Sequence, residues 1–130
     1  MASYLLAMLV RLSSGTMERH GMSRDNLGEF EHMVLLGILR LGGEAYSVPI
    51  VFELEDRTGR EIAQSAVFIA MKRLEKKGLL LSRMDDTSVK ETGRVRRYFK
   101  LTSSGEEKLR ETREALVSLW DGVAAQLDRA

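Results

Sequence analysis

The stretch QSAVFIAMKRLEKKGLLLSR, residues 64–83, decides the fold because it changes from helical to strand character within twenty residues. Apolar residues recur every three or four positions, which predicts an amphipathic helix whose buried face carries Val67, Ala70, Met71 and Leu74. Gly78 stands where a left-handed glycine commonly ends a helix. Residues 79–83 then have the composition of a strand. The stretch therefore predicts a helix over residues 64–77 followed directly by a strand.

Downstream of this stretch, a second strand is predicted over residues 95–101, with Val95, Phe99 and Leu101 on one face. Residues 85–93 between the strands are polar and include Gly93, which is typical of a hairpin tip. The two strands and the segment between them predict a β-hairpin.

Two further amphipathic helices are predicted upstream. The first begins at Asn26, which has the spacing of a capping box with Glu29, and ends at Gly42–Gly43. The second is capped by Ser47 and ends at residues 58–59. Their expected buried residues are Phe30, Val34, Leu35, Ile38 and Leu41 in the first helix and Ile50, Val51 and Leu54 in the second.

Three short helices followed by a hairpin are the element order of a winged helix-turn-helix, a mainly α fold with a small β-hairpin. We expect this DNA-binding domain over residues 26–102 and a C-terminal dimerisation helix over residues 103–130. Residues 1–25 are expected to be an extension outside the domain. The apolar run over residues 4–10 is too short for a membrane span, and no Lys or Arg precedes it, as a secretory signal would require.

Charge is distributed unevenly along the chain. The net charge is +1, but residues 64–101 carry ten Lys or Arg against four Asp or Glu, a local charge of +6. This basic segment coincides with the third helix and the wing, the parts of a winged helix that face DNA. Charge alone is equally consistent with a solvated surface, and it is the coincidence with position that favours a polyanionic partner.

Composition excludes several classes of function. The chain has no cysteine, so disulfides, thiolate metal sites and cysteine nucleophiles are excluded, and a cytoplasmic location is expected. The two histidines, His20 and His32, are too few for a usual zinc site. Phosphate-loop, dinucleotide-binding and G-x-S-x-G motifs are absent. We therefore expect neither an enzyme nor a bound cofactor.

The sequence resembles the PadR family of transcriptional regulators over about residues 26–127. The resemblance lies in LGEFE at residues 27–31, AYS at 45–47, KRLEKKGL at 72–79, and GRVRRYFKLT at 93–102 with Gly105. It implies a homodimer that binds DNA through its winged domain, with a short C-terminal dimerisation element. Four positions depart from the family pattern, namely Ser47, Ala63, Phe68 and Ser103.

The helix over residues 64–77 is expected to enter the major groove. Gln64 and Ser65 are expected to hydrogen-bond base edges, and Ile69 to contact a thymine methyl group. Lys72, Arg73 and Lys76 are expected to contact phosphates. Two alternatives remain open: Phe68 packs against the wing or the first helix instead, and Arg73 pairs with Glu75 or Glu55.

The wing carries Lys90, Arg94, Arg96 and Arg97. Strand alternation places Arg94 and Arg96 on the face opposite Val95. A wing arginine in the minor groove would sense groove shape, but attraction to the DNA backbone is the favoured interpretation for most of these cations.

The last helix opens at Thr102 or Ser103, with Ser103 and Glu106 in capping-box spacing. Its apolar stripe has near-heptad spacing, which favours a partner helix, with the first helix contributing to the contact. The predicted dimer interface consists of Leu109, Leu116, Leu119, Trp120, Val123 and Leu127. Alternatively the helix folds back on its own domain, or Trp120 lines a pocket for a small-molecule effector.

These features predict a sequence-specific DNA-binding transcriptional regulator that binds a pseudo-palindromic operator as a homodimer. We expect a repressor. The alternative is a winged-helix protein-interaction module without DNA binding.

Overall fold

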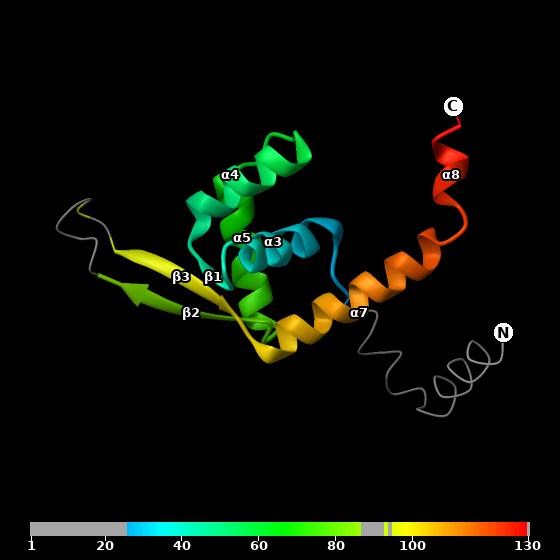
Figure 1. Ribbon diagram of the computed structural model, residues 1–130. Helices are drawn as coiled ribbons and strands as arrows, with labels where there is room; N and C mark the ends of the chain where they lie inside the picture. The colour runs from blue at the N-terminus through cyan, green and yellow to red at the C-terminus, as the bar shows by residue number, and fades with distance from the viewer. Residues whose placement is uncertain (1–25, 87–92, 94, 130) are drawn as a thin grey trace, which may run out of the picture.

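The computed structural model describes residues 26–86, 93 and 95–129 (Figure 1). Three helices, α3 (Glu29–Arg40), α4 (Ser47–Thr58) and α5 (Gln64–Lys76), are followed by the long strands β2 (Leu80–Asp85) and β3 (Arg96–Leu101). A two-residue strand, β1 (Glu44–Ala45), precedes α4, and α7 (Ser103–Trp120) and α8 (Ala124–Leu127) complete the chain. The predicted winged helix-turn-helix is confirmed.

One hydrophobic core joins the three helices to the sheet. Every residue predicted for the buried face of α5 is buried, and the buried residues of α3 and α4 include Val34, Leu35, Ile38, Ile50 and Leu54. Phe30, Leu41 and Val51 pack at the edge of this core. Phe99 of β3 is fully buried and contributes the sheet's largest core side chain. The helical periodicity therefore identified the faces that pack together.

The sheet has three antiparallel strands in the order β1-β3-β2, so β3 is central and β2 is an edge strand. Pairing of β2 with β3 ends at Asp85↔Arg96. The expectation that Val95 lies on the inner face of a strand is wrong, because Val95 precedes β3 and is exposed. The strand β1 was not predicted, since two residues are too few to show a period.

The capping positions upstream differ from those predicted. Helix α3 begins at Glu29, so its N-cap is Gly28 and not Asn26. The Gly28 amide donates to Glu31 Oε1 at 3.3 Å. Ser47 is the first residue of α4 and not its cap.

The junction between the wing and α7 is closely packed. Thr102 is the N-cap of α7, where its hydroxyl accepts from the Gly105 amide at 3.0 Å and donates to the Gly78 carbonyl at 2.8 Å. The Ser103–Glu106 capping box is therefore wrong, and Thr102 is the correct choice of the two. A Cβ on Gly105 would lie 2.3 Å from the Leu79 carbonyl oxygen, so this position admits only glycine. These contacts fix where α7 leaves the domain.

The C-terminal region is two helices and not the single one expected. The first ends at Trp120, because Gly122 adopts a left-handed backbone with φ of +81°. Leu109 of α7 is buried in the core of its own domain, where α7 packs against α3, and is therefore not free to contact a partner. Beyond this contact, the end of α7 and α8 extend away from the domain (Figure 1). None of the described helices combines the length and apolar character that a membrane span requires.

Candidate nucleic-acid interface

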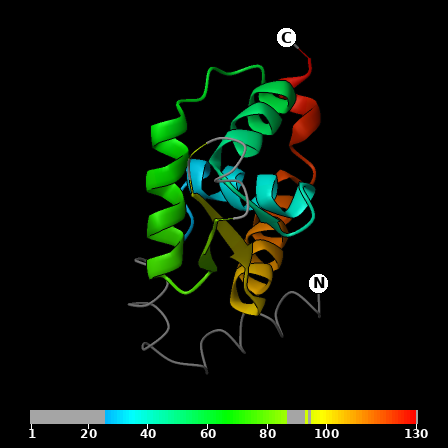
Figure 2. The same ribbon diagram turned by 90° about the vertical axis from the view of Figure 1, so that its left-hand side faces the viewer.

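The outward face of α5 carries all seven residues predicted for it. Val67, Ala70, Met71 and Leu74 turn inward and are buried, whereas seven other positions of the helix are exposed to solvent. The exposed positions are Gln64, Ser65, Phe68, Ile69, Lys72, Arg73 and Lys76. Figure 2 shows α5 along one side of the molecule, with the wing running beside its C-terminal end toward the viewer. The helix thus presents polar residues at its N-terminal end, Phe68 and Ile69 in the middle and three cations toward its C-terminal end.

The N-terminal end of α5 is tied to the start of α4. The Gln64 side-chain amide donates to Ser47 Oγ at 3.1 Å. This bond orients the Gln64 side chain at the N-terminal end of α5 and gives a role to the Ser47 hydroxyl.

Phe68 packs against the wing, one of the two alternatives left open by the sequence. Its ring meets the buried Phe99 ring edge-to-face, with centroids 6.1 Å apart and planes at 83°. With 40% of Phe68 exposed, the ring supports the wing from the α5 side and still reaches the surface.

Arg73 does not form the ion pairs that were considered for it. Among the described residues, Glu75 contacts Lys72 Nζ at 3.7 Å, and Glu55 accepts the Ile62 amide at 3.1 Å. Neither carboxylate is within ion-pair distance of Arg73. The guanidinium therefore stays on the outward face of α5.

The two arginines of β3, Arg96 and Arg97, lie on opposite faces of the sheet, as strand alternation requires. Arg97 shares the α5-facing side of β3 with Phe99, and its guanidinium donates to Ser82 Oγ at 3.3 Å. Arg96 lies on the other face, where its guanidinium stacks over the Tyr46 ring at 4.6 Å from the centroid. Lys90 and Arg94 lie outside the described residues.

A cation–aromatic cluster on the outer face of the wing was not predicted. Tyr46 contacts Tyr98 edge-to-face at 5.4 Å, and Arg83 covers Tyr98 at 4.7 Å from the ring centroid. Arg83 also donates to Glu44 across the central strand, at 2.9 Å and 3.1 Å. Hydrogen bonds from Arg83 hold the pKa of the Glu44 carboxyl below its ordinary value, against the opposing effect of burial. The one feature of the sequence that could have indicated this cluster is the alternation of β3, which places Tyr98 on the same strand face as Arg96.

Several cations elsewhere in the domain are bound to carboxylates. Arg40 and Arg57 both contact Glu53, at 2.6 Å and 3.3 Å. Lys77 contacts Glu31 at 3.0 Å. These pairs neutralise part of the positive charge elsewhere in the domain. The outward face of α5 is therefore more strongly cationic than the surfaces that carry these pairs.

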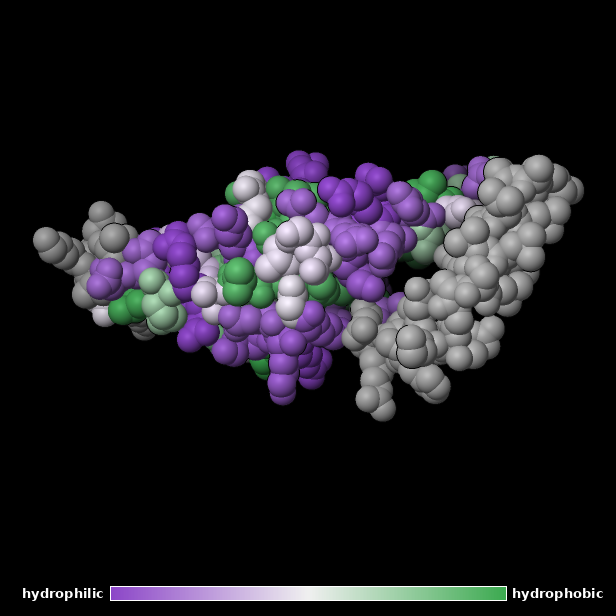
Figure 3. Space-filling view, turned by 90° about the horizontal axis from the view of Figure 1, so that it is seen from below, coloured by the Kyte–Doolittle hydropathy of each residue, from purple (hydrophilic) through white to green (hydrophobic). Residues whose placement is uncertain are grey.

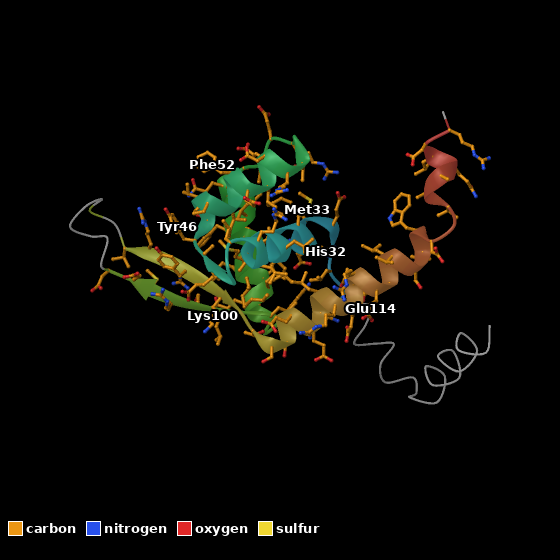
Figure 4. The ribbon with its side chains drawn as sticks, in the orientation of Figure 1. His32, Met33, Tyr46, Phe52, Lys100 and Glu114 are labelled. Carbon is orange, nitrogen blue, oxygen red and sulfur yellow. The ribbon has the colours of Figure 1, made fainter. Side chains whose placement is uncertain are left out.

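A groove of about 730 Å³ lies between α3 and the C-terminal helices. Its apolar walls are formed by Leu36, Leu39, Leu109, Leu116, Val117 and Trp120. His32 lines the same groove (Figure 4), and burial lowers the pKa of its imidazole. Figure 3 shows that the domain surface seen from below is largely hydrophilic, with hydrophobic residues exposed toward α8. Apolar side chains also reach the surface elsewhere, among them Phe52 on α4, Ile69 on α5 and Leu81 on β2.

Comparison with family models matches residues 35–111 to the transcriptional regulator PadR-like family. The chain belongs to this family. A comparison with curated proteins found no match. This PadR-like chain is also similar to a PadR family transcriptional regulator from Eggerthella lenta DSM 2243, at 29% identity and a TM-score of 0.60, over 96% of this chain and 99% of that one.

Two more distant solved structures share the fold. A PadR family regulator from Clostridium difficile R20291 is 20% identical with a TM-score of 0.60, over 74% of this chain and 97% of that one. Bacillus subtilis PadR in complex with operator DNA is 22% identical with a TM-score of 0.54, over 64% of this chain and 45% of that one. The family match confirms the resemblance expected from the sequence and the expectation that this PadR-like protein is not an enzyme.

Proposed function

We propose that this PadR-like regulator binds specific sequences in duplex DNA, with α5 in the major groove and the wing on the adjoining backbone. The observation that carries the proposal is the outward face of α5, where Gln64 and Ser65 stand at the N-terminal end and Lys72, Arg73 and Lys76 in the C-terminal half. Side chains at the start of a recognition helix reach base edges, whereas cations farther along reach phosphates.

Each side chain has a role that fits its chemistry. Gln64 and Ser65 offer donors and acceptors for base edges, and Ile69, 53% exposed, offers an apolar contact for a thymine methyl group. Arg96 and Arg97 flank the wing on its two faces, which suits a ribbon lying between two phosphate backbones. Lys90 and Arg94, by their place in the sequence, would extend this attraction toward the wing tip.

We further propose that the protein binds as a homodimer through α7 and α8. Exposed apolar residues recur there, including Leu116, Leu119, Trp120, Val123 and Leu127, of which Leu119 is 73% exposed. Such a stripe favours a partner surface. A two-fold dimer would read a pseudo-palindromic operator with half-sites about 34–36 Å apart. Binding over a promoter would block transcription, so we propose a repressor.

A second proposal concerns an effector site at the Trp120 groove. Its volume of about 730 Å³ and its mainly apolar walls suit a drug-sized aromatic molecule. The apolar probe 1-anilinonaphthalene-8-sulfonate should gain fluorescence on binding there, and Trp120→Ala should abolish the gain. Phe52→Ala is the matched control, since Phe52 is an exposed apolar residue of α4 that does not line the groove. Equal loss in both variants would reject the site.

The test of DNA binding uses a random-sequence library of duplexes. We expect the protein to enrich a common motif and to bind it more tightly than a shuffled duplex, with an affinity that falls steeply as salt rises. Binding without preference or salt dependence would reject the proposal. Absence of binding to any duplex would favour the alternative, a winged-helix protein-interaction module without DNA binding.

A further inference from the structure

Glu75 is an anomaly in the proposed interface because it places a carboxylate among the cations of α5 and the wing. Its side chain is 27% exposed and lies between Lys72 of α5 and Ser82 of β2. A negative charge there weakens attraction to phosphates. A compensating role is therefore expected.

The contacts of Glu75 supply that role. Its Oε2 accepts the Ser82 amide at 3.1 Å and also the Ser82 hydroxyl. Since β2 is an edge strand, this amide has no neighbouring strand to pair with on that side, and the carboxylate takes the place of one. The helix in the proposed major-groove position is thus bonded directly to the backbone of the wing.

The same contacts extend to a cation on each side. Ser82 Oγ accepts from Arg97 of β3 at 3.3 Å, and Glu75 Oε1 lies 3.7 Å from Lys72 Nζ. The hydroxyl hydrogen bond from Ser82, joined by its amide and by the nearby cations, lowers the pKa of the Glu75 carboxyl below its ordinary value in spite of burial. The charged form is therefore the one that makes these contacts at neutral pH.

We propose that Glu75 is a positioning residue for DNA recognition: it sets the wing, and Arg97 within it, at a fixed distance from α5. The wing and the helix then meet the duplex in one geometry, which favours the correct sequence over all others. The residue reduces general attraction to DNA and increases discrimination. This inference rests on the proposed DNA-binding function.

The sign of the effect separates positioning from simple electrostatics. Glu75→Gln removes the charge but keeps an oxygen that can accept from Ser82, so it should tighten binding to the selected and shuffled duplexes by the same factor. Glu75→Ala removes both. It should strengthen or preserve binding to the shuffled duplex, weaken binding to the selected one, and reduce the ratio of the two affinities about ten-fold, as expected for a lost hydrogen bond to a charged group.

The control is Glu114→Ala, which removes one exposed carboxylate from α7 (Figure 4). It should leave the affinity ratio unchanged, and thermal melting should show all three variants folded at the assay temperature. Equal tightening by Glu75→Ala and Glu75→Gln, or an equal loss of discrimination in both, would overturn the inference, because either result would assign the effect to charge. Failure of the wild-type protein to prefer any duplex would instead reject the proposed function.

Discussion

Replacing Lys72 or Arg96 by alanine tests the interface through the salt dependence of binding. Lys72 is half-exposed, and its 3.7 Å contact with Glu75 is loose enough to exchange for a phosphate. The Arg96 guanidinium lies over the Tyr46 ring, a contact that uses the ring face and leaves the N–H groups of the guanidinium to donate to a phosphate. We expect both variants to weaken binding to the selected and shuffled duplexes by similar factors, because phosphate contacts carry no sequence information.

The magnitude follows from the described cations of the proposed interface. Each protomer contributes Lys72, Arg73, Lys76, Arg96 and Arg97, so a dimer makes at most two sets of these contacts. Counterion release then gives a slope of log K against log salt of about −9 from these residues. Either substitution removes two phosphate contacts from the dimer and makes the slope shallower by about 1.8. If the variant and the wild type bind equally at 1 M salt, this change in slope lowers the affinity of the variant about sixty-fold at 0.1 M salt.

Fluorescence anisotropy with a labelled duplex, titrated at several salt concentrations, measures this slope. Arg57→Ala is the matched control, since it removes a cation that is already bound to Glu53. Its slope should equal that of the wild type. An unchanged slope in both the Lys72 and Arg96 variants would remove these residues from the interface and refute the reasoning. A change of about 0.9 would indicate one contact per complex and argue against a dimer.

Three further predictions follow from packing, exposure and burial. Gly105→Ala should lower the free energy of unfolding by about 1–3 kcal/mol in urea denaturation because its Cβ would clash with backbone, whereas Gly28→Ala, with no atom nearer than 3.8 Å, should change it little. Leu119→Glu should convert a dimer to a monomer in analytical ultracentrifugation, and a monomeric wild type would contradict this prediction. The control Phe52→Glu, which also replaces an exposed apolar residue by an acidic one but lies on α4, should leave the dimer unchanged. Burial lowers the pKa of His32, so the unfolded chain takes up its proton first; stability should fall as the pH drops below about 6.5, and His32→Gln should flatten that fall in thermal melts.

Much of the domain could be predicted from interactions between residues close together in the sequence. The buried residues of α3, α4 and α5 were identified because a helix brings positions three and four apart onto one face. The exposed face of α5 followed from the same geometry by exclusion. Gly78 follows the end of α5 with φ of +79°, a conformation that glycine adopts readily because it has no Cβ.

The errors arose where several segments competed for the same position. The N-cap of α7 is Thr102 and not Ser103, because the Gly78 carbonyl accepts its hydroxyl proton. Leu109 belongs to the core and not to the proposed dimer face, since α3 covers it. Periodicity marked Leu109 as buried, but it carried no information on which surface buries it.

By itself the sequence determined the order of the three domain helices and the two hairpin strands, the faces that these helices bury and the segment that carries positive charge, because each depends on residues close together in the chain. Only the tertiary structure decided which charges remain available. It places Glu75 against Ser82, Arg83 against Glu44 and Arg96 over Tyr46. These partners lie 7, 39 and 50 positions apart, and the folded chain alone brings them within the few ångströms over which hydrogen bonds and cation–aromatic contacts act.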